Sequence, residues 1–242
     1  MNIFVSTSNK YLHLLKPFMF LFNKFWSEDQ PVTILGYKKP EFELEKNFKF
    51  FSLGEDDNVN NWSSDLRRYF ELEYISEEPF IYLMEDCLIT EKVNLSFVKS
   101  LENVYHQTIG KLGRILLSND VKGLRVQSVF PHNLVEICQD ENWRISTSIS
   151  LWDKRYWLKY LISGRTPWEF EVEGSKEAKN DGWHILAMKD NYPSYFTNGI
   201  SRHDNDLFKI DFNYWKEPGK RLDQNIINEM IEKDIIKKEW IK

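Results

Sequence analysis

The chain has 242 residues, of which 42% are hydrophobic and 29% are charged, and these proportions indicate a soluble globular protein that buries a substantial core. The formal net charge of −5 argues against a nucleic-acid polymer as partner, because such binding needs a basic surface that displaces counterions from phosphates. Two cysteines, Cys87 and Cys138, are too few for a disulfide framework or a zinc cluster, and their apolar surroundings favour reduced, buried thiols in the cytoplasm.

The beginning of the chain has no basic leader and no long apolar segment before a cleavage site, so we expect no export. The most apolar stretch, residues 10–25, is interrupted by Lys16, Pro17 and Lys24 and is too short to span a bilayer. It predicts a core helix, with contact to a membrane surface as the alternative, and we expect no transmembrane segment.

Extended and helical patterns alternate along the first half of the chain. Apolar runs predict strands at residues 2–5, 31–37, 49–53 and 80–84, and helical patterns occupy residues 10–25 and 61–74. Parallel strands need crossover connections, which are nearly always helices. The alternation therefore predicts an α/β fold, with a mostly parallel central sheet and helices on both faces.

The second half is less regular. Strand patterns occur at residues 134–137, 143–146 and 183–188, and helical patterns at residues 153–161, 167–178 and 222–233. Residues 189–206 are rich in Asn, Asp, Ser, Pro and Gly, which predicts a long loop of the kind that often carries function.

The run of residues 80–87 is the most informative, because an apolar strand ends in two adjacent carboxylates, Glu85 and Asp86. In an open α/β sheet, ligands bind at the carboxyl ends of the strands, and acids at such a position can hold a metal ion. The alternative is an ordinary surface turn that follows a strand.

The turn after the first strand, residues 6–9, contains hydroxyl and amide side chains that either bind a polar ligand or cap the following helix. No glycine-rich dinucleotide or phosphate loop follows this strand. There is also no Gly-x-Ser-x-Gly elbow, so nucleophilic acyl transfer has no support.

A second acidic segment follows Thr166. Thr166, Pro167 and Glu169 form the pattern of a capping box, which gives Glu169 a structural role at a helix start. Glu171 has no such role in the pattern. Because it lies near Trp168 and Phe170, we expect partial desolvation to raise its pKa and make it a better proton acceptor, the alternative being a solvated helix surface.

Two further features bear on binding. His203 lies in a polar loop, where it either completes a metal site with Asp86 or is simply exposed. Nine tryptophans and eleven tyrosines exceed what a core requires. Their rings either stack on sugars and bases or pack within a mixed sheet.

Taken in order, these segments resemble a small glycosyltransferase of the GT-A type, similar to the short sugar transferases of bacterial and phage surface-glycan or capsule clusters. The pieces that carry the resemblance are residues 5–11, 34–37, 61–66, 82–86, 150–154 and 163–171. The resemblance implies one GT-A-like domain over residues 1–242. Residues 1–120 would bind the nucleotide-sugar and residues 121–242 would bind the acceptor and carry catalysis.

In such enzymes the acidic pair corresponds to an Asp-x-Asp motif that coordinates Mn²⁺ or Mg²⁺ on the donor diphosphate. Here the order is Glu85-Asp86-Cys87, with cysteine where the second aspartate falls. The resemblance implies Asp86 as the first metal ligand, Glu85 as the second and His203 as a third.

The resemblance also implies the remaining roles. Glu171 would be the general base, with Glu169 as the fallback. A base in this position favours inversion of the anomeric centre, the alternative being a retaining transferase, which can carry a similar acid. The donor would be a nucleotide sugar, expected to be a UDP-sugar, and the acceptor a hydroxyl of a glycan or another molecule. The residues implied to contact the nucleotide are Thr7, Ser8, Tyr11, Gly36, Trp62, Asp65 and Glu85.

Two other classes of function fit the residues. One is a noncatalytic glycan-binding or interaction module on the same fold, for which the aromatic residues and the missing second aspartate argue. The other is a glycoside hydrolase that uses Glu85 or Asp86 together with Glu171 as its carboxylate pair.

Overall fold

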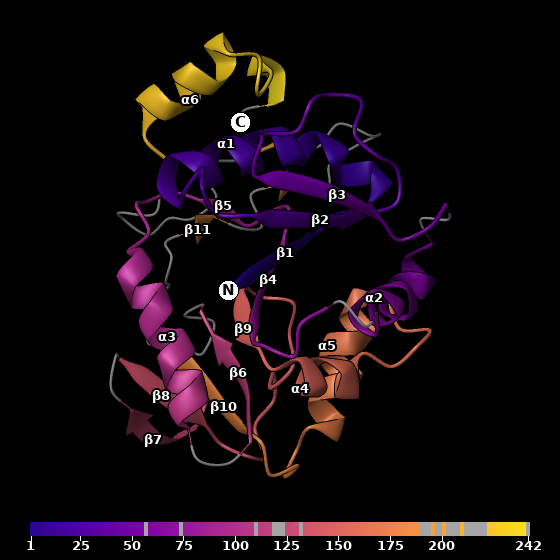
Figure 1. The fold of residues 1–242 in the computed structure, drawn as a ribbon, viewed down its shortest axis with the longest axis vertical. Coiled ribbons are helices and arrows are strands. Elements are labelled where there is room, and N and C mark those ends of the chain that lie inside the picture. Colours follow the sequence, from indigo (N-terminus) through magenta and orange to yellow (C-terminus); the bar gives the residue numbers. More distant parts are fainter. Residues whose placement is uncertain are drawn as a thin grey trace.

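A computed structural model describes residues 1–55, 58–72, 75–108, 111–117, 124–130, 133–188 and 222–240, together with three two-residue strands at 195–196, 200–201 and 209–210. In this described part, the fold is a mixed α/β structure with one large central sheet (Figure 1).

The central sheet has the strand order β3-β2-β1-β4-β9-β6-β10-β8-β7 within the described residues. The strands are β1 (Asn2–Ser6), β2 (Val32–Gly36), β3 (Phe48–Ser52), β4 (Phe80–Met84), β6 (Leu112–Leu116), β7 (Val126–Phe130), β8 (Leu134–Ile137), β9 (Ser150–Trp152) and β10 (His184–Met188). The first four strands of this order are parallel. Only β8 and β9 run against the others, which confirms the predicted, mostly parallel sheet.

Two pairs of short strands lie outside the central sheet. β5 (Leu88–Ile89) pairs with β11 (Tyr195–Phe196), and β12 (Ile200–Ser201) pairs with β13 (Lys209–Ile210), each antiparallel. These pairs interrupt the long loop predicted at residues 189–206. Within residues 189–206 the structure describes β11 and β12, and the other residues of this stretch lie outside the described part.

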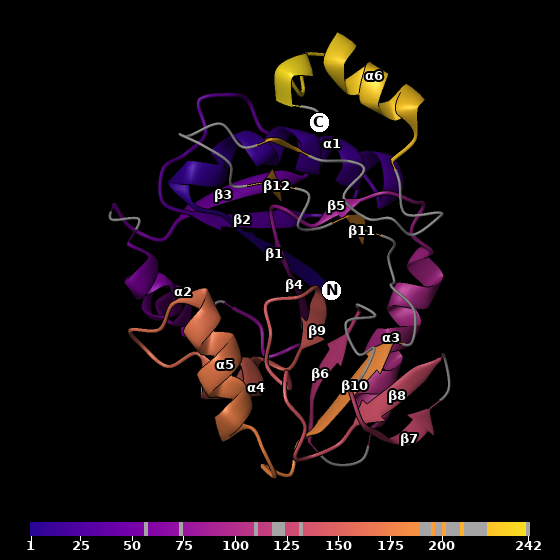
Figure 2. The same ribbon diagram turned by 180° about the vertical axis from the view of Figure 1, so that it is seen from behind.

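The helices of the described chain are α1 (Leu15–Phe25), α2 (Trp62–Phe70), α3 (Leu95–Gln107), α4 (Lys154–Tyr160), α5 (Pro167–Glu177) and α6 (Gln224–Glu232), with 3-10 turns η1 (Asn9–Leu14), η2 (Val59–Asn61) and η3 (Lys238–Trp240). Side chains of α1, α3 and α6 share one hydrophobic cluster, and those of α2, α4 and α5 share another. Helices therefore cover both faces of the sheet, and α6 lies outside α1 (Figures 1 and 2).

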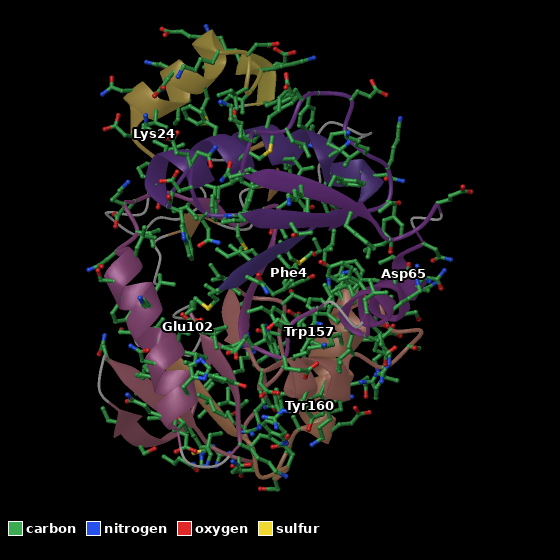
Figure 3. All side chains as sticks on the ribbon, in the orientation of Figure 1. Phe4, Lys24, Asp65, Glu102, Trp157 and Tyr160 are labelled. Carbon is green, nitrogen blue, oxygen red and sulfur yellow. The ribbon has the colours of Figure 1, made fainter. Side chains whose placement is uncertain are left out.

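The strands divide their side chains between these two clusters because successive residues of a strand point to opposite faces. In β1, Ile3 and Val5 join the cluster of α1, while Phe4 joins that of α2. The second cluster is strongly aromatic. Phe4 packs edge-to-face on Phe70 at 5.1 Å between ring centroids, and Trp157 of α4 packs on Phe70 at 5.7 Å (Figure 3). Aromatic packing of this kind accounts for Trp62, Trp152, Trp157 and Trp183.

One predicted strand is wrong and several elements were not predicted. Residues 143–146 form an irregular turn, in which Trp143 has a φ of 59° and Arg144 is fully buried. The Arg144 guanidinium donates hydrogen bonds to the carbonyl oxygens of Ala178 and Trp183. The segment is thus held by this side chain and not by pairing with a neighbouring strand. Strands β6, β7 and β9 and helix α3 were not predicted individually.

The remaining predicted elements agree with the structure within a few residues. The helix predicted at residues 10–25 begins as η1 and continues as α1. Both cysteines are free, with Cys87 buried and Cys138 partly exposed. Among the described helices, none is long and apolar enough to cross a membrane.

Candidate functional site

The order in which the chain adds strands to the sheet reverses between β1 and β4. From β1 the chain moves outward to β2 and β3, and it then returns to the other side of β1 to form β4. In open α/β sheets this switch point is where the loops at the carboxyl ends diverge and ligands bind. Ser6, the last residue of β1, pairs with Met84, the last residue of β4. Thr7 and the pair Glu85 and Asp86 therefore begin at the same edge of the sheet.

The turn after β1 is fixed by backbone contacts. Thr7 is buried, and its N–H donates to the carbonyl oxygen of Leu35 at 2.9 Å. Ser8 occupies the cap position of η1, but its side chain makes no capping hydrogen bond. The capping interpretation of this turn is therefore not realised by Ser8. Ser8 is half-buried and lies two residues after the end of β1, and Tyr11 follows within η1, packed partly against the core.

Gly36, the last residue of β2, lets the turn after β1 approach closely. A Cβ at this position would lie 2.9 Å from Cγ2 of Thr7 and 3.0 Å from the ring of Phe50. Distances that short require a neighbour to move. A side chain at Gly36 would therefore displace Thr7 or Phe50.

Asp65 ties the start of α2 to the end of β2. Its Oδ2 accepts a hydrogen bond from the Tyr37 hydroxyl at 2.8 Å, and its Oδ1 forms an ion pair with Arg68 at 3.1 Å. The side chain is buried. Both carboxylate oxygens of Asp65 thus have protein partners, and the residue positions Tyr37 at this edge of the sheet.

Trp62 lies beneath this edge. It is buried and packs edge-to-face on Phe170 at 5.4 Å and on Trp157 at 6.5 Å between ring centroids. Of the two roles expected from the sequence, stacking on a ligand or packing, the structure gives Trp62 the packing role.

The two acids after β4 differ in their surroundings. Glu85 is 3% exposed, and its N–H donates to the carbonyl oxygen of Ser6 at 3.3 Å. Asp86 retains some exposure, and burial raises its pKa above the ordinary value, opposed in part by its own backbone N–H and by the Cys87 thiol, 3.9 Å from Oδ1. Among the described residues, no cationic side chain forms an ion pair with Asp86.

The second half of the chain reaches the same edge through β9. This strand is antiparallel to β4, with Ser150 opposite Tyr82, so the loop that precedes β9 lies beside the carboxyl end of β4. In that loop Thr147 donates its N–H at 2.5 Å and its hydroxyl at 2.7 Å to Oε1 of Glu171. Glu171 is therefore brought to the edge that carries Asp86.

The expectation that Glu171 has no structural partner is wrong, because Thr147 supplies two hydrogen bonds to it. Glu169 has the expected structural role: its N–H donates to Thr166 Oγ1 at 3.2 Å, and its Oε2 accepts from the Thr166 N–H at 2.8 Å. Hydrogen bonds from the backbone N–H and the side chain of Thr166 to the carboxylate lower the pKa of Glu169, which is exposed at the start of α5.

Arg114 of β6 supports the loop that holds Glu171, and sequence reasoning missed it. The side chain is fully buried, donating from Nε to Ser150 Oγ at 2.8 Å and from Nη2 to Ser146 Oγ at 2.5 Å. Its guanidinium carbon lies 4.7 Å from the centroid of the Trp152 ring. The signal available in the sequence was an arginine within an otherwise apolar run, since arginine is almost never fully buried without partners.

The start of α5 lies beside the start of α2. The hydroxyl of Ser63 donates to the carbonyl oxygen of Ile162 at 2.7 Å and accepts from the Arg165 N–H at the same distance. The segment that carries Glu169 and Glu171 is thus anchored to the helix that carries Asp65.

A complete protein-only metal site does not form among the described residues, which contain no group of three or more His, Cys, Asp and Glu side chains placed to hold one ion. His203, the expected third ligand, lies outside the described residues. The carboxylates at the switch point are those of Glu85 and Asp86.

The sequence matches no known protein family and no curated protein sequence. Among solved structures, the chain is similar to a cytidylyltransferase from Leptospira borgpetersenii serovar Hardjo-bovis, with 12% identity, coverage of 98% of this chain and 96% of that one, and a TM-score of 0.47. It is also similar to the galactosyltransferase LgtC in complex with donor and acceptor sugar analogues, with 12% identity, coverage of 77% and 73%, and a TM-score of 0.42. At these identities and TM-scores the likenesses do not decide the function of this chain.

Proposed function

We propose that the chain is a glycosyltransferase of the GT-A type, which transfers a sugar from a nucleoside-diphosphate sugar, expected to be a UDP-sugar, to a hydroxyl of a glycan or another acceptor. The observation that carries this proposal is the pair Glu85 and Asp86 at the switch point of the sheet. A carboxylate with a raised pKa and no described ion pair favours a site where a ligand supplies positive charge.

Mn²⁺ or Mg²⁺ fits these donors. Such hard cations prefer oxygen ligands, and Mg²⁺ is commonly bound through one or two carboxylates together with substrate phosphates. Asp86 and Glu85 would hold the ion, with His203 as the proposed third ligand. The cation would stabilise the negative charge that develops on the departing diphosphate. Positive charge beside Asp86 would also offset the cost of burying its carboxylate.

The residues around this point would hold the nucleotide. Thr7, Ser8 and Gly36 supply hydroxyl groups and close backbone approach at the ends of β1 and β2. Tyr11 and Asp65 lie on the two elements that flank these ends, and Trp62 would support them from the core. In this proposal residues 1–120 bind the donor, and residues 121–242 contribute the acceptor side.

Glu171 would act as the general base in an inverting reaction. Both hydrogen bonds from Thr147 go to Oε1, and among the described residues Oε2 accepts none, which leaves this oxygen for a proton from the acceptor hydroxyl. Glu169 is the fallback, because its Oε2 is already used by the helix cap. The free state of Cys87 and Cys138 fits a reducing cytoplasm, which remains part of the proposal.

The test combines binding with turnover. Isothermal titration with UDP should give tighter binding when Mn²⁺ is present, and Asp86→Ala should remove this difference. A panel of nucleotide sugars, assayed with Mn²⁺ for hydrolysis and for transfer, then identifies the donor. Glu171→Gln should keep UDP binding and lower turnover by about a hundredfold or more.

Glu173→Gln is the matched control for Glu171→Gln. Glu173 lies on the same helix and pairs with Lys176 at the surface, so its substitution should leave turnover nearly unchanged. Full turnover by Glu171→Gln would refute the base assignment. Binding of glycan with no response to UDP or Mn²⁺ would favour the noncatalytic module, and glycan cleavage without a nucleotide donor would favour a hydrolase. Release of pyrophosphate from a nucleoside triphosphate would indicate nucleotidyl transfer instead.

A further inference from the structure

A second site is suggested by a cavity of about 310 Å³ on the α1 side of the sheet. Its walls come from η1 and the first turn of α1, from the loop after β2, and from the segment between α6 and η3. Figures 1 and 2 show this C-terminal segment folded back over α1. None of the residues assigned above to donor, metal or base lines the cavity.

The cavity is basic although the chain as a whole is acidic. Four lysines and two carboxylates line it, in a protein with a formal net charge of −5. Lys38 pairs with Glu41 at 3.2 Å, and Lys16 donates to the backbone oxygen of Asp234 at 3.4 Å. Lys39 and Lys237, on opposite walls, have no carboxylate partner among the described residues.

Aromatic rings complete the lining. The imidazole of His13 packs edge-on against Trp240 with 5.3 Å between ring centroids, and Lys237 Nζ lies 6.0 Å from the same ring. Lys16 Nζ lies 5.4 Å from the ring of Phe42 on the other wall. Burial lowers the pKa of His13, so the lysines are the cations of this cavity at neutral pH.

We propose that this cavity binds a small phosphorylated molecule with a flat ring. Lys39 and Lys237 would contact the phosphate, since lysine binds phosphate as a mobile point charge. The ring would lie against Trp240 and Phe42, where apolar and aromatic contact gives orientation. The volume falls at the lower end of the range of small-molecule pockets. The phosphate group itself occurs both in free metabolites and in phospholipid headgroups, and the experiment separates these sources.

The probe is phenyl phosphate, titrated calorimetrically into the full-length chain. We expect one binding event per chain that weakens by about tenfold or more in the double variant Lys39→Glu/Lys237→Glu. The double variant Lys46→Glu/Lys49→Glu carries the same change of charge on two exposed residues that do not line the cavity, and it should change the affinity by less than about twofold. Asp86→Ala should also leave the affinity unchanged, so the result does not depend on the proposed donor site.

Two further titrations test the parts of the proposal. Inorganic phosphate should bind more weakly than phenyl phosphate, and Trp240→Leu should reduce that difference; equal binding of the two compounds would refute the ring contact. Vesicles of phosphatidylglycerol and phosphatidylcholine should not bind, and binding to vesicles without binding of phenyl phosphate would overturn the proposal in favour of a membrane surface. No binding of phenyl phosphate, or binding unaffected by the double charge reversal, would also overturn it. Lys39 and Lys237 are exposed, so thermal melting should confirm that the double variant remains folded.

Discussion

Asp86 and Asp153 follow neighbouring buried strands, β4 and β9, and because these strands are antiparallel the two acids lie at opposite edges of the sheet. Asp153 caps α4, accepting from the Tyr156 N–H at 2.9 Å, from the Tyr105 hydroxyl at 2.5 Å and from Arg155 at 2.8 Å. Burial alone would raise the pKa of Asp153, but these donors outweigh it and lower the pKa.

Among the described residues, Asp86 has its own backbone N–H and the Cys87 thiol to oppose the effect of burial, and its pKa is raised. The same sequence pattern, an apolar strand followed by aspartate, therefore gives two kinds of acid. At the edge of Asp153 the protein donates hydrogen bonds to the carboxylate, and its charge stabilises the fold. At the edge of Asp86 the buried charge opposes folding, as is common where a bound ligand supplies the compensating charge.

The largest expected effect is that of Asp86→Asn on turnover. Loss of the carboxylate should weaken the hold on the cation and lower sugar-nucleotide turnover by about a thousandfold, or about 4 kcal/mol of barrier. The same variant should melt at an equal or higher temperature at neutral pH, because no charge must be buried. Assays of turnover and thermal melting on one preparation measure both.

Asp153→Asn is the control for this variant. It should keep turnover within a few fold and melt at a lower temperature, since Asp153 supports the fold rather than the site. If Asp86→Asn kept its activity and melted lower, the contrast between the two edges would be broken.

A second, smaller effect concerns the donors of Asp153. Tyr105→Phe removes the hydroxyl that links α3 to this carboxylate, and a hydrogen bond to a charged group contributes about 2 kcal/mol. Urea unfolding should show this loss of stability. In an Asp153→Asn background the same substitution should cost clearly less, and an undiminished cost would show that the hydroxyl acts through other contacts.

The smallest expected effect is on the pH dependence of stability. In the native state the pKa of Asp86 is raised above its ordinary value of 3.8. Between the unfolded-state pKa and the native-state pKa, the native state therefore binds more protons than the unfolded state. The contribution of Asp86 to stability consequently falls as pH rises from about 4. The pKa of Asp153 is lowered, so its contribution is present above about pH 4 and is lost as pH falls through the folded-state pKa. Urea unfolding of wild type and the two asparagine variants between about pH 3 and pH 7 should give curves of the difference in unfolding free energy against pH that slope in opposite directions. Parallel curves would contradict the assignment.

The parts of the fold predicted from sequence are those with local signals. The four parallel strands, the capping box at Thr166 and the acids after β4 are each visible in a short window of residues. β9 has only three residues and no periodicity of its own, and it is a strand because β4 and β6 lie on either side of it. The false strand at residues 143–146 has alternating Trp, Arg, Ile and Ser, but Arg144 points inward to distant carbonyl oxygens.

The same distinction holds for the site. Glu85 and Asp86 could be found because the pattern of the strand before them is visible in a short stretch of sequence. The contact of Thr147 with Glu171 joins a loop to a helix farther along the chain, and no short stretch contains both residues. Arg114 holds Ser146 and Ser150 in the same way. Such pairings depend on the packed sheet, which no short window of sequence specifies.

The brevity of β9 has a mechanical consequence. It pairs on one side with β4 and on the other with β6, and so connects the four parallel strands to the remainder of the sheet. If the four parallel strands moved relative to the block of strands beyond β9, the few backbone hydrogen bonds that β9 makes with β4 and β6 would have to break. The ladder at residues 150–152, together with the contacts of α2 on α4 and on the start of α5, therefore makes the two blocks move together and keeps the loop bearing Thr147 in place relative to the end of β4.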